Sequence, residues 1–309
     1  MDRSHLLGDK ASTTVRAMDY IVCLIAQPER EILGQELVQR IARGLGTLPR
    51  WLAEGEACEY AVTGDPAALR ALVQTETADR AIDVCVLPAE GRRKLLLISD
   101  LDSTMITIES IDELADMAGA KAEVAEITGR AMRGELAFAP ALEARVALLA
   151  GLPDTIFDEV YHSRLRLMPG ARCLVRTMAG KGAISALVSG GFMPLAERVQ
   201  RDIGFDVVQA NRLEVVDGQL TGRVLPPIVG PEAKLTLLKR LCERQHIKPD
   251  QVLAVGDGAN DLPMLHAAGL GVAFRAHAPV AREVSVAIEH GDLRALLFLQ
   301  GIEEGEFAA

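Results

Sequence analysis

The sequence predicts a doubly wound α/β fold with a parallel sheet, preceded by a small α+β unit of ferredoxin-like order. The α/β prediction rests on short apolar segments that alternate with helical ones from Lys94 onward. Several of these segments end abruptly in polar residues, which is typical of strands whose carboxyl ends carry a site. The order β-α-β-β-α-β before that point predicts the small unit. We expect a mobile leader at residues 1–18, the small unit at 19–90 and the main unit at 91–309.

Apolar periodicity and turn residues predict the elements of the small unit. The first helix ends at Gly46, and a second begins at Asp65-Pro66, because proline suits the first helical position. Strands are expected where short apolar segments lie between turn residues. The expected strands are 20–25, 51–52, 58–62 and 82–87, and the expected helices are 32–45 and 65 to about 74.

The main unit is expected to contain a helical insertion, or cap, at about residues 105–168. This stretch holds no convincing strand and is far longer than an ordinary crossover between two strands. A second interruption is the Asp217-Gly218 dipeptide, which predicts a β-hairpin between 213–216 and 219–224 that could act as a flap. The expected sheet strands are 95–99, 183–188, 207–210, 252–256 and 271–274, with a weaker candidate at 286–288.

Composition and charge argue against several classes of partner. The formal net charge of −10 opposes binding to nucleic acid or to an anionic membrane, and aromatic residues make up only 4% of 309 residues, too few for a stacking platform. Five scattered cysteines without ligand spacing indicate reduced thiols and not a zinc site. No signal peptide and no apolar segment of about 20 residues is apparent. We therefore expect a cytoplasmic protein without nucleic-acid or membrane partners.

Polar residues suited to catalysis or anion binding follow three of the predicted strands and begin one predicted helix. Each of these segments has an ordinary explanation when it is taken alone: a helix cap, a tight turn or a solvated lysine. The carboxyl ends of parallel strands meet at one edge of a sheet, however, so we expect the segments to converge. They are Asp100-Leu101-Asp102, Ser189-Gly190-Gly191, Lys234, and Asp257 with Asn260 and Asp261.

Electrostatics indicates what such a convergence needs. At 4 Å and an effective dielectric near 20, each pair of like charges costs about 4 kcal/mol. The single Lys234 cannot offset several such pairs, whereas a divalent cation can, and oxygen-only donors favour Mg²⁺ over zinc. Carboxylates, a hard cation, a lysine and a glycine-rich anion cradle together indicate phosphoryl chemistry. No Gly-x-x-x-x-Gly-Lys loop is present, which argues against a nucleoside triphosphatase.

In order and spacing, the four segments resemble the four motifs of the haloacid dehalogenase superfamily. The best match within it is the phosphoserine phosphatase family, over about residues 94–300. The resemblance implies that Asp100 is the nucleophile of an aspartyl-phosphate mechanism and that Asp102 is first the acid and then the base. It also implies Mg²⁺ bound by Asp100, the backbone carbonyl of Asp102 and Asp257, with Asp261 supporting these ligands. Leu101 stands where the family often has phenylalanine, which affects only local packing.

The same resemblance implies how a substrate would be held. Ser189, Gly190, Lys234 and Asn260 would bind the phosphoryl oxygens. On their own, Glu109 and Arg145 are better explained as surface charges or a salt bridge. The resemblance reverses that preference, because an acid and a base suit the ammonium and carboxylate of O-phosphoserine. The implied cap pocket consists of Glu109, Met132, Phe138 and Arg145, with Gly134 and Glu135 beside it.

The expected reaction is hydrolysis of O-phosphoserine to serine and phosphate, the last step of L-serine biosynthesis. Another phosphatase or a phosphotransferase acting on a small phosphate monoester is the near alternative, and a non-catalytic amino-acid sensor is the distant one. A hydride-transferring enzyme is disfavoured, because no good dinucleotide loop exists. The small unit resembles ACT-type domains, which leaves amino-acid binding, a homodimer contact and a purely structural role open.

Overall fold

Two sheets organise the part of the chain that the computed structural model describes, residues 19–30, 32–132 and 135–308. The first is a four-stranded antiparallel sheet of order β2-β3-β1-β4. The second has seven strands in the order β11-β10-β9-β5-β6-β7-β8, and only its β7–β8 pair is antiparallel. The parallel α/β prediction is therefore confirmed. The expected leader at 1–18 lies outside the described residues.

The antiparallel sheet is covered on both faces. Val22, Leu24 and Val86 point to the helical side and pack with α1 and α2, whereas Cys23 and Cys85 point to the main unit and join its core. The side chain of Asp65 caps α2 by accepting a 2.8 Å hydrogen bond from the backbone N–H of Ala68. The elements are β1 Asp19–Ala26, α1 Gln35–Leu45, β2 Arg50–Ala53, β3 Ala57–Thr63, α2 Pro66–Thr77 and β4 Ile82–Pro88.

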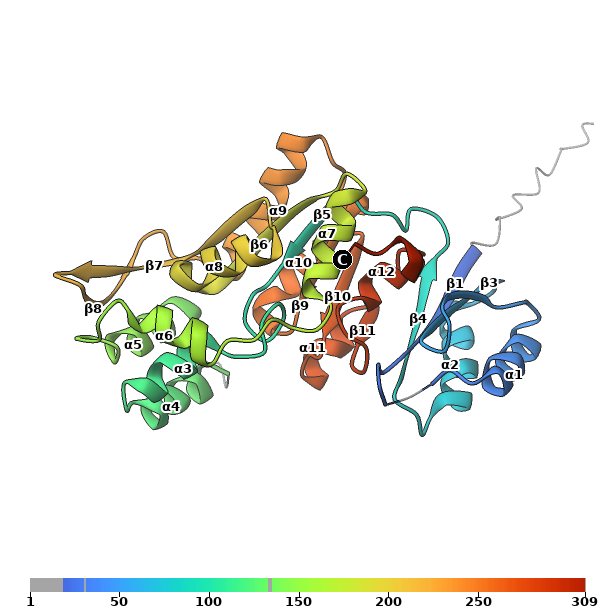
Figure 1. Ribbon diagram of the computed structural model, residues 1–309, viewed down its shortest axis with the longest axis horizontal. Coiled ribbons are helices and arrows are strands. Elements are labelled where there is room, and N and C mark those ends of the chain that lie inside the picture. Colours follow the sequence, from blue (N-terminus) through green and yellow to red (C-terminus); the bar gives the residue numbers. More distant parts are fainter. Residues whose placement is uncertain (1–18, 31, 133–134, 309) are drawn as a thin grey trace, which may run out of the picture.

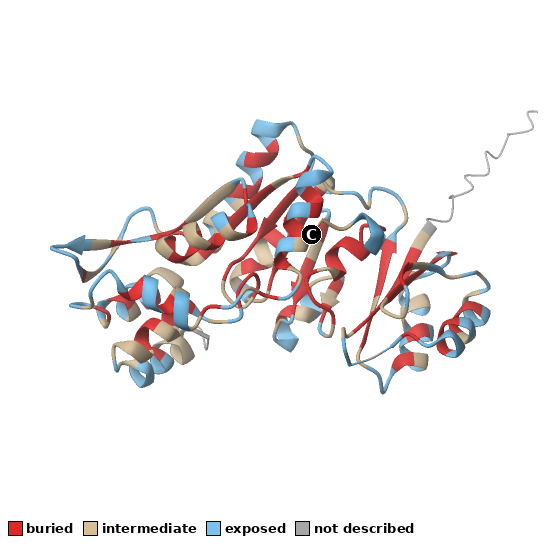
Figure 2. Cartoon of the chain, in the orientation of Figure 1, coloured by how far each residue is buried: buried red, intermediate tan, exposed pale blue. Residues whose placement is uncertain are grey.

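The parallel sheet lies between helices on both of its faces (Figure 1). Alternate residues of β5 show this, because Leu97 packs with α7 and α8 whereas Leu96 and Ile98 pack with α9 and α10. Figure 2 shows the buried residues concentrated along the central strands. The strands are β5 Leu96–Ser99, β6 Ile184–Phe192, β7 Val207–Val216, β8 Gln219–Leu225, β9 Val252–Gly256, β10 Leu270–Phe274 and β11 Val286–Ile288.

Among the described residues, six α-helices of the main unit accompany these strands outside the cap. They are α7 Ala171–Gly180, α8 Met193–Ile203, α9 Pro231–Gln245, α10 Leu262–Ala267, α11 Ala278–Glu283 and α12 Ala295–Phe298. Across all the residues described, the structure contains no helix with both the length and the apolar character that a membrane crossing requires.

Two strands are longer than their sequences indicated. The strand expected at 183–188 continues through Gly190 and Gly191 to Phe192, with an irregular register against β7 between Val188 and Phe192. Val188 pairs with Gln209 and Phe192 with Asn211, so the glycines lie in an irregular part of the strand between two paired residues. Strand β7 likewise continues from the sheet into the hairpin without a break.

The insertion forms a helical cap, as expected, with no strand of its own among its described residues. Its two connections to the sheet run side by side: the N–H of Thr107 donates to the carbonyl of Arg166 at 3.0 Å, and the N–H of Met168 donates to that of Met105 at 2.9 Å. The cap helices are α3 Ser110–Met117, α4 Lys121–Met132, α5 Phe138–Ala147 and α6 Ile156–Ser163.

The predicted hairpin exists, and it is fastened to the cap. Asp217 and Gly218 form its turn with φ values of 51° and 75°. The N–H of Gly151 donates to the carbonyl of Leu220 at 2.8 Å, and the N–H of Leu220 donates to the carbonyl of Leu152 at 2.9 Å. The hairpin thus extends the sheet edge to the loop that follows α5.

Replacing Gly222 with alanine should loosen this attachment. Gly222 has a φ of +81°, and a Cβ atom there would lie 3.0 Å from Ala150 and 3.2 Å from Ala147. Gly218→Ala is the matched control, because its φ of +75° is equally strained but no atom lies within 4 Å. We expect the free energy of unfolding to fall by about 1 kcal/mol for Gly218→Ala and by about 2–3 kcal/mol for Gly222→Ala in urea titrations. Equal losses would contradict a tight hairpin–cap contact.

Candidate active site

The ends of β5 and β9 bring two acidic segments together. The strands pair in parallel with Ser99 opposite Val255, so the residues that follow them are neighbours. The N–H of Asp100 donates to the carbonyl of Val255 at 3.0 Å, which extends the ladder one residue beyond β5. Asp257 follows β9, and the hydroxyl of Thr104 donates to its Oδ1 at 3.1 Å. The convergence expected from the strand ends is therefore observed.

A buried lysine lies behind these carboxylates. Nζ of Lys234 is 2.7 Å from Oδ2 of Asp100 and 2.6 Å from Oδ1 of Asp261, and the residue is 0% exposed. Burial alone would lower the pKa of Lys234, but the charges of Asp100 and Asp261 raise it above its ordinary value. The lysine is thus held as a cation at the end of the sheet.

The acidic cluster has more negative charge than this lysine can offset. Asp100, Asp257 and Asp261 each offer one oxygen, and the three oxygens lie within 4.8 Å of one another. Burial, followed by the charge of Asp100, raises the pKa values of Asp257 and Asp261 to about 7. An oxygen-only donor set with surplus negative charge fits a hard divalent cation.

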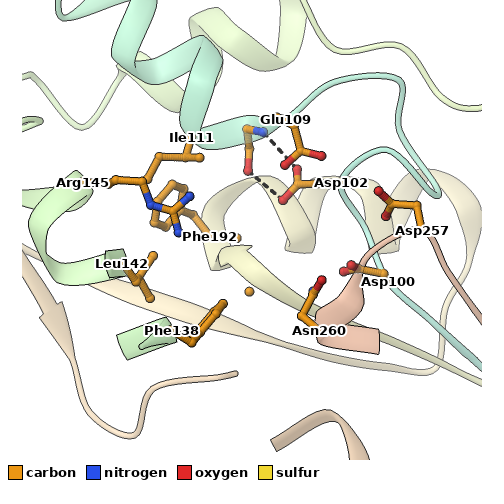
Figure 3. A pocket seen from close by; sticks show the side chains of 13 residues that line it. Asp100, Asp102, Glu109, Ile111, Phe138, Leu142, Arg145, Phe192, Asp257 and Asn260 are labelled. Carbon is orange, nitrogen blue, oxygen red and sulfur yellow. Dashed lines mark hydrogen bonds between the residues drawn. The ribbon is translucent and has the colours of Figure 1, made fainter. Parts of the chain in front are cut away.

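Asp102 points away from this cluster and is bound by the first residue of α3. The backbone N–H of Ser110 donates to Oδ1 of Asp102 at 3.1 Å and the hydroxyl of Ser110 to Oδ2 at 3.0 Å (Figure 3). Burial, then the charges of Glu109 and Asp100, raises the pKa of Asp102 well above its usual range. This shift favours the protonated form of Asp102, the form that a general acid needs.

Three glycines make room for these side chains. A Cβ atom on Gly191 would lie 2.5 Å from Oδ2 of Asp102, and one on Gly256 would lie 2.4 Å from the carboxyl carbon of Asp261. On Gly258 it would lie 2.2 Å from Oδ1 of Asn260. Glycine is required at these positions because the functional groups occupy the space of a side chain.

A cavity of about 220 Å³ separates the sheet edge from the cap. Its floor carries carboxylates, and its walls include the apolar side chains Phe138 and Leu142 from the cap and Phe192 from the sheet (Figure 3). The ring of Phe138 lies so close to Gly190 and Gly230 that a Cβ atom on either glycine would be 3.0 Å or 2.9 Å from it. The cavity thus has carboxylates at its floor and apolar side chains among the groups of its walls.

Glu109 and Arg145 place opposite charges on the cap side of this cavity. Oε1 of Glu109 accepts a 2.5 Å hydrogen bond from the hydroxyl of Ser103. The guanidinium of Arg145 donates to the carbonyl of Ala141 at 3.2 Å and to the hydroxyl of Thr128 at 3.4 Å. Both side chains therefore belong to the cavity and not simply to the outer surface.

Most of the residues singled out from the sequence meet at this cavity. Lys234 and Asp261 lie behind its floor, and Ser189 is buried beside Asp102, with its hydroxyl 3.5 Å from Oδ2. The side chain of Met132 and the whole of Gly134 lie outside the described residues. The predicted residues that line the cavity are Asp100, Asp102, Glu109, Phe138, Arg145, Gly190, Asp257 and Asn260.

Sequence reasoning missed Asn211, which joins two parts of the site. Its amide donates to the carbonyls of Gly190 at 2.8 Å and Val229 at 3.1 Å, and its oxygen accepts from the N–H of Val229 at 2.7 Å. Asn211 thereby ties the end of β6 to the segment that leads into α9 and Lys234. No local pattern marks it. Ser110, Ile111, Leu142 and Phe192 were also missed as cavity residues.

Comparison with known proteins identifies similar sequences. The model of a family described as haloacid dehalogenase-like hydrolase matches residues 97–266. A phosphoserine phosphatase of Streptomyces coelicolor is 46% identical over 257 residues, covering 82% of this chain and 62% of that protein. Another, of Mycobacterium tuberculosis, is 47% identical over 235 residues, covering 75% of this chain and 57% of that protein. The chain thus spans less than two thirds of these two relatives. A phosphoserine phosphatase of a Polaromonas species is 47% identical over 209 residues, covering 66% of this chain and 89% of that protein.

Solved structures of the same kind resemble the fold. A probable phosphoserine phosphatase from Vibrio cholerae, in unliganded form, has a TM-score of 0.76 and 31% identity, covering 94% of this chain and 88% of that one. A phosphoserine phosphatase solved as an analogue of the phospho-aspartyl intermediate has a TM-score of 0.62 and 37% identity, covering 67% of this chain and 98% of that one.

The acidic cluster should make the metal-free protein less stable at alkaline pH. Because the folded pKa of Asp257 is raised from 3.8 to about 7, its protonated form stabilises the fold fully below about pH 4 and ceases to do so as the pH rises through 7. Between pH 6 and 8 this loss is about 1 kcal/mol, or about 2 °C in melting temperature. With a chelator present, we expect Asp257→Asn to lose less stability over this interval than the wild type, whereas exposed Asp154→Asn should behave as the wild type. If the stability of the wild type and of Asp257→Asn depends on pH in the same way, the pKa of Asp257 is not raised by burial and the neighbouring carboxylates, and the prediction is wrong.

Proposed function

The chain belongs to the haloacid dehalogenase-like hydrolases, and from this membership we propose that it hydrolyses O-phospho-L-serine to serine and phosphate with the help of Mg²⁺. The reaction would be the last step of L-serine biosynthesis. One observation carries the substrate assignment: the cavity presents acidic residues on its floor and a separated acid and base, Glu109 and Arg145, on the cap. A phosphate monoester with an ammonium and a carboxylate group fits this arrangement: its phosphate would lie at the floor with the metal ion, its ammonium beside Glu109 and its carboxylate beside Arg145.

In the proposed first step, a carboxylate oxygen of Asp100 attacks phosphorus and the bond from phosphorus to the serine oxygen breaks. Asp102 gives its proton to that oxygen, so that serine leaves as a neutral alcohol. Two contacts support Asp100 in this role: its Oδ1 accepts from the N–H of Leu101 at 2.7 Å, and its Oδ2 pairs with Lys234. These contacts orient the carboxylate at the cavity floor.

In the second step, Asp102, now ionised, removes a proton from water, and the resulting nucleophile attacks the phosphorus of the aspartyl phosphate. The bond to Asp100 breaks, which releases phosphate and restores both carboxyl groups. The relative solved as a phospho-aspartyl intermediate analogue supports this proposal by similarity. The raised pKa of Asp102 also supports it, because the first step needs a protonated acid.

We assign the phosphoryl oxygens to Ser189, Gly190, Lys234 and Asn260. Gly190 and Asn260 line the cavity, and Lys234 lies directly behind Asp100. The Ser189 hydroxyl accepts from the N–H of Gly191 at 2.8 Å and donates to Oδ2 of Asp102 only at 3.5 Å, a long bond that it can exchange for an anion. These donors would face charge that develops on the phosphoryl group.

Asp100, Asp257 and the backbone carbonyl of Asp102 are the proposed ligands of Mg²⁺. When bound, the ion would neutralise charge on the phosphoryl oxygens. Asp261 would act indirectly, since its carboxylate pairs with Lys234 and accepts a 3.1 Å hydrogen bond from the N–H of Gly258. Its contribution is to hold the lysine beside Asp100.

Substrate selection is assigned to the cap. Glu109 would pair with the ammonium group, Arg145 would bind the carboxylate, and Phe138 and Met132 would contribute to the wall. A guanidinium can hold a carboxylate through two hydrogen bonds. Among the described residues, the hydrogen bonds that Arg145 donates are long, at 3.2 Å and 3.4 Å, so it can exchange them for a substrate.

The N-terminal unit, at 19–90, is proposed to be ACT-like, a proposal that its sheet order β2-β3-β1-β4 supports. A homodimer through this unit is also proposed. One face of its sheet packs on the main unit, so the dimer contact would use another part of the unit. Cytoplasmic location is proposed as well, since the five cysteines are free thiols.

Asp100→Asn should abolish catalysis without unfolding the protein. The amide oxygen is a poor nucleophile, so we expect phosphate release from O-phosphoserine to fall by about 10³-fold or more. Phosphate release from a panel of monoesters, with and without an acceptor alcohol, measures this loss and separates hydrolysis from phosphoryl transfer. Exposed Asp154→Asn is the control, and chelation should abolish the wild-type rate reversibly. Activity retained in Asp100→Asn would eliminate the mechanism.

Arg145→Ala should weaken substrate binding selectively. Loss of the carboxylate contact should raise KM for O-phosphoserine by about 10-fold or more, while hydrolysis of p-nitrophenyl phosphate, which has no carboxylate, changes little. Arg130→Ala is the matched control, since Arg130 lies on the same cap and pairs with Glu135 at 3.5 Å. An unchanged KM for O-phosphoserine in Arg145→Ala would contradict the substrate assignment.

A further inference from the structure

The segment at residues 289–294 lies between the N-terminal unit and the cap connections. It follows β11, the edge strand of the parallel sheet, and leads into α12. The N-terminal unit and the cap occupy opposite ends of the long axis of the molecule, with β11 and α12 on the side of the N-terminal unit (Figure 1). This segment is in contact with both, as the following bonds show.

The first half of the segment holds a buried carboxylate of the N-terminal unit. Asp83, on β4, is 5% exposed and accepts hydrogen bonds from three successive backbone N–H groups. The distances are 2.9 Å from Glu289, 3.2 Å from His290 and 2.8 Å from Gly291. Hydrogen bonds from backbone N–H groups to an ionised carboxylate are roughly twice as strong as those between neutral groups. Asp83 therefore fixes the backbone of 289–291.

The second half of the segment is held by another carboxylate of the N-terminal unit. Arg294 pairs with Glu56 at 2.9 Å and with Asp292 at 2.9 Å. Glu56 belongs to the turn between β2 and β3, so it comes from a different part of that unit than Asp83. Both ends of the segment are thus attached to the N-terminal unit.

The same segment supports the return connection of the cap. The N–H of Leu293 donates to the carbonyl of Pro169 at 3.1 Å. The next residue, Gly170, has a φ of +82°, and a Cβ atom there would lie 2.7 Å from the backbone N of Arg294. A displacement of 292–294 would therefore displace Pro169 and Gly170.

The return connection is in turn bonded to the loop that carries the two catalytic carboxylates. The N–H of Met168 donates to the carbonyl of Met105 at 2.9 Å, and the N–H of Met105 donates to the carbonyl of Leu101 at 2.8 Å. Arg275, with an unusual φ of +47°, adds weaker contacts from its guanidinium to Gly291 and Met168. A continuous set of bonds thus runs from Asp83 to the base of the cap.

We propose that Asp83 and Glu56 are positioning residues for the cap: by holding 289–294, they fix the connection about which Glu109 and Arg145 are aligned with the cavity floor. The N-terminal unit would then act on substrate binding without touching the substrate. The kinetic consequences rest on the proposed function, whereas the structural consequences do not.

The test compares wild type, Asp83→Asn, Glu56→Gln and the double variant by steady-state kinetics and hydrogen–deuterium exchange. Asn places N–H groups against the amide donors, so it should release 289–291 while keeping the side-chain shape. We expect KM for O-phosphoserine to rise about fivefold with kcat within about twofold, and exchange at 105–107 and 166–170 to rise about tenfold. Because both residues act through one segment, the double variant should raise KM by less than the product of the single effects.

Arg50→Ala is the matched control. Arg50 pairs with Glu59 of its own unit at 2.9 Å and with Glu303 of the main unit at 3.0 Å, so it joins the two units without pairing with any residue of 289–294. We expect it to leave KM and exchange in the cap connections unchanged. If Arg50→Ala reproduces the effects of Asp83→Asn, attachment of the unit in general is responsible and the proposal fails. Unchanged exchange in both Asp83→Asn and Glu56→Gln also overturns it, whether or not the wild type proves to hydrolyse O-phosphoserine.

Discussion

The buried contact of Lys234 with Asp100 and Asp261 is the interaction on which the rest of the site depends. It holds one cation at distances of 2.7 Å and 2.6 Å among three closely spaced carboxylates. Burying such charges is costly unless they are paired and hydrogen-bonded. The surrounding structure keeps these groups in place. Glycines leave space for the carboxylates, and Asn211 bonds the segment before α9 to β6. The register of β5 against β9 brings Asp100 close to Asp257.

The site divides its tasks between a rigid sheet edge and an inserted cap. Groups proposed to react with phosphorus lie at the ends of buried parallel strands, where backbone pairing positions them. Groups proposed to recognise the rest of the substrate lie directly before α3 and on α5. The cap is braced by the hairpin at one side and by the paired connections at its base. Fold and chemistry are therefore linked through backbone hydrogen bonds more than through individual side-chain contacts.

How much the sequence could predict depended on the range of the interactions involved. Asp100, Asp102 and Asp257 were predictable because each follows a short apolar strand, and parallel strands share one carboxyl edge. The continuation of β6 through Gly190 and Gly191 was not, because it depends on the pairing of Phe192 with Asn211 beyond an irregular stretch. The partners of Asn211, Ser110 and Asp83 are brought to them by the fold. Ser110 is eight residues from its partner Asp102 in the sequence, and Asp83 is 208 residues from its partner Gly291. No local pattern could reveal them.

A crystal structure of the protein with Mg²⁺ and trifluoroberyllate, a mimic of an acyl phosphate, would test directly whether Asp100 is the phosphorylated residue and shares the metal ion with Asp257. We expect beryllium to be bonded to a carboxylate oxygen of Asp100, with its fluorines facing Ser189 and Lys234. We expect the metal ion to contact both Asp100 and Asp257. Beryllium bound elsewhere, or an ion held without Asp257, would contradict these expectations.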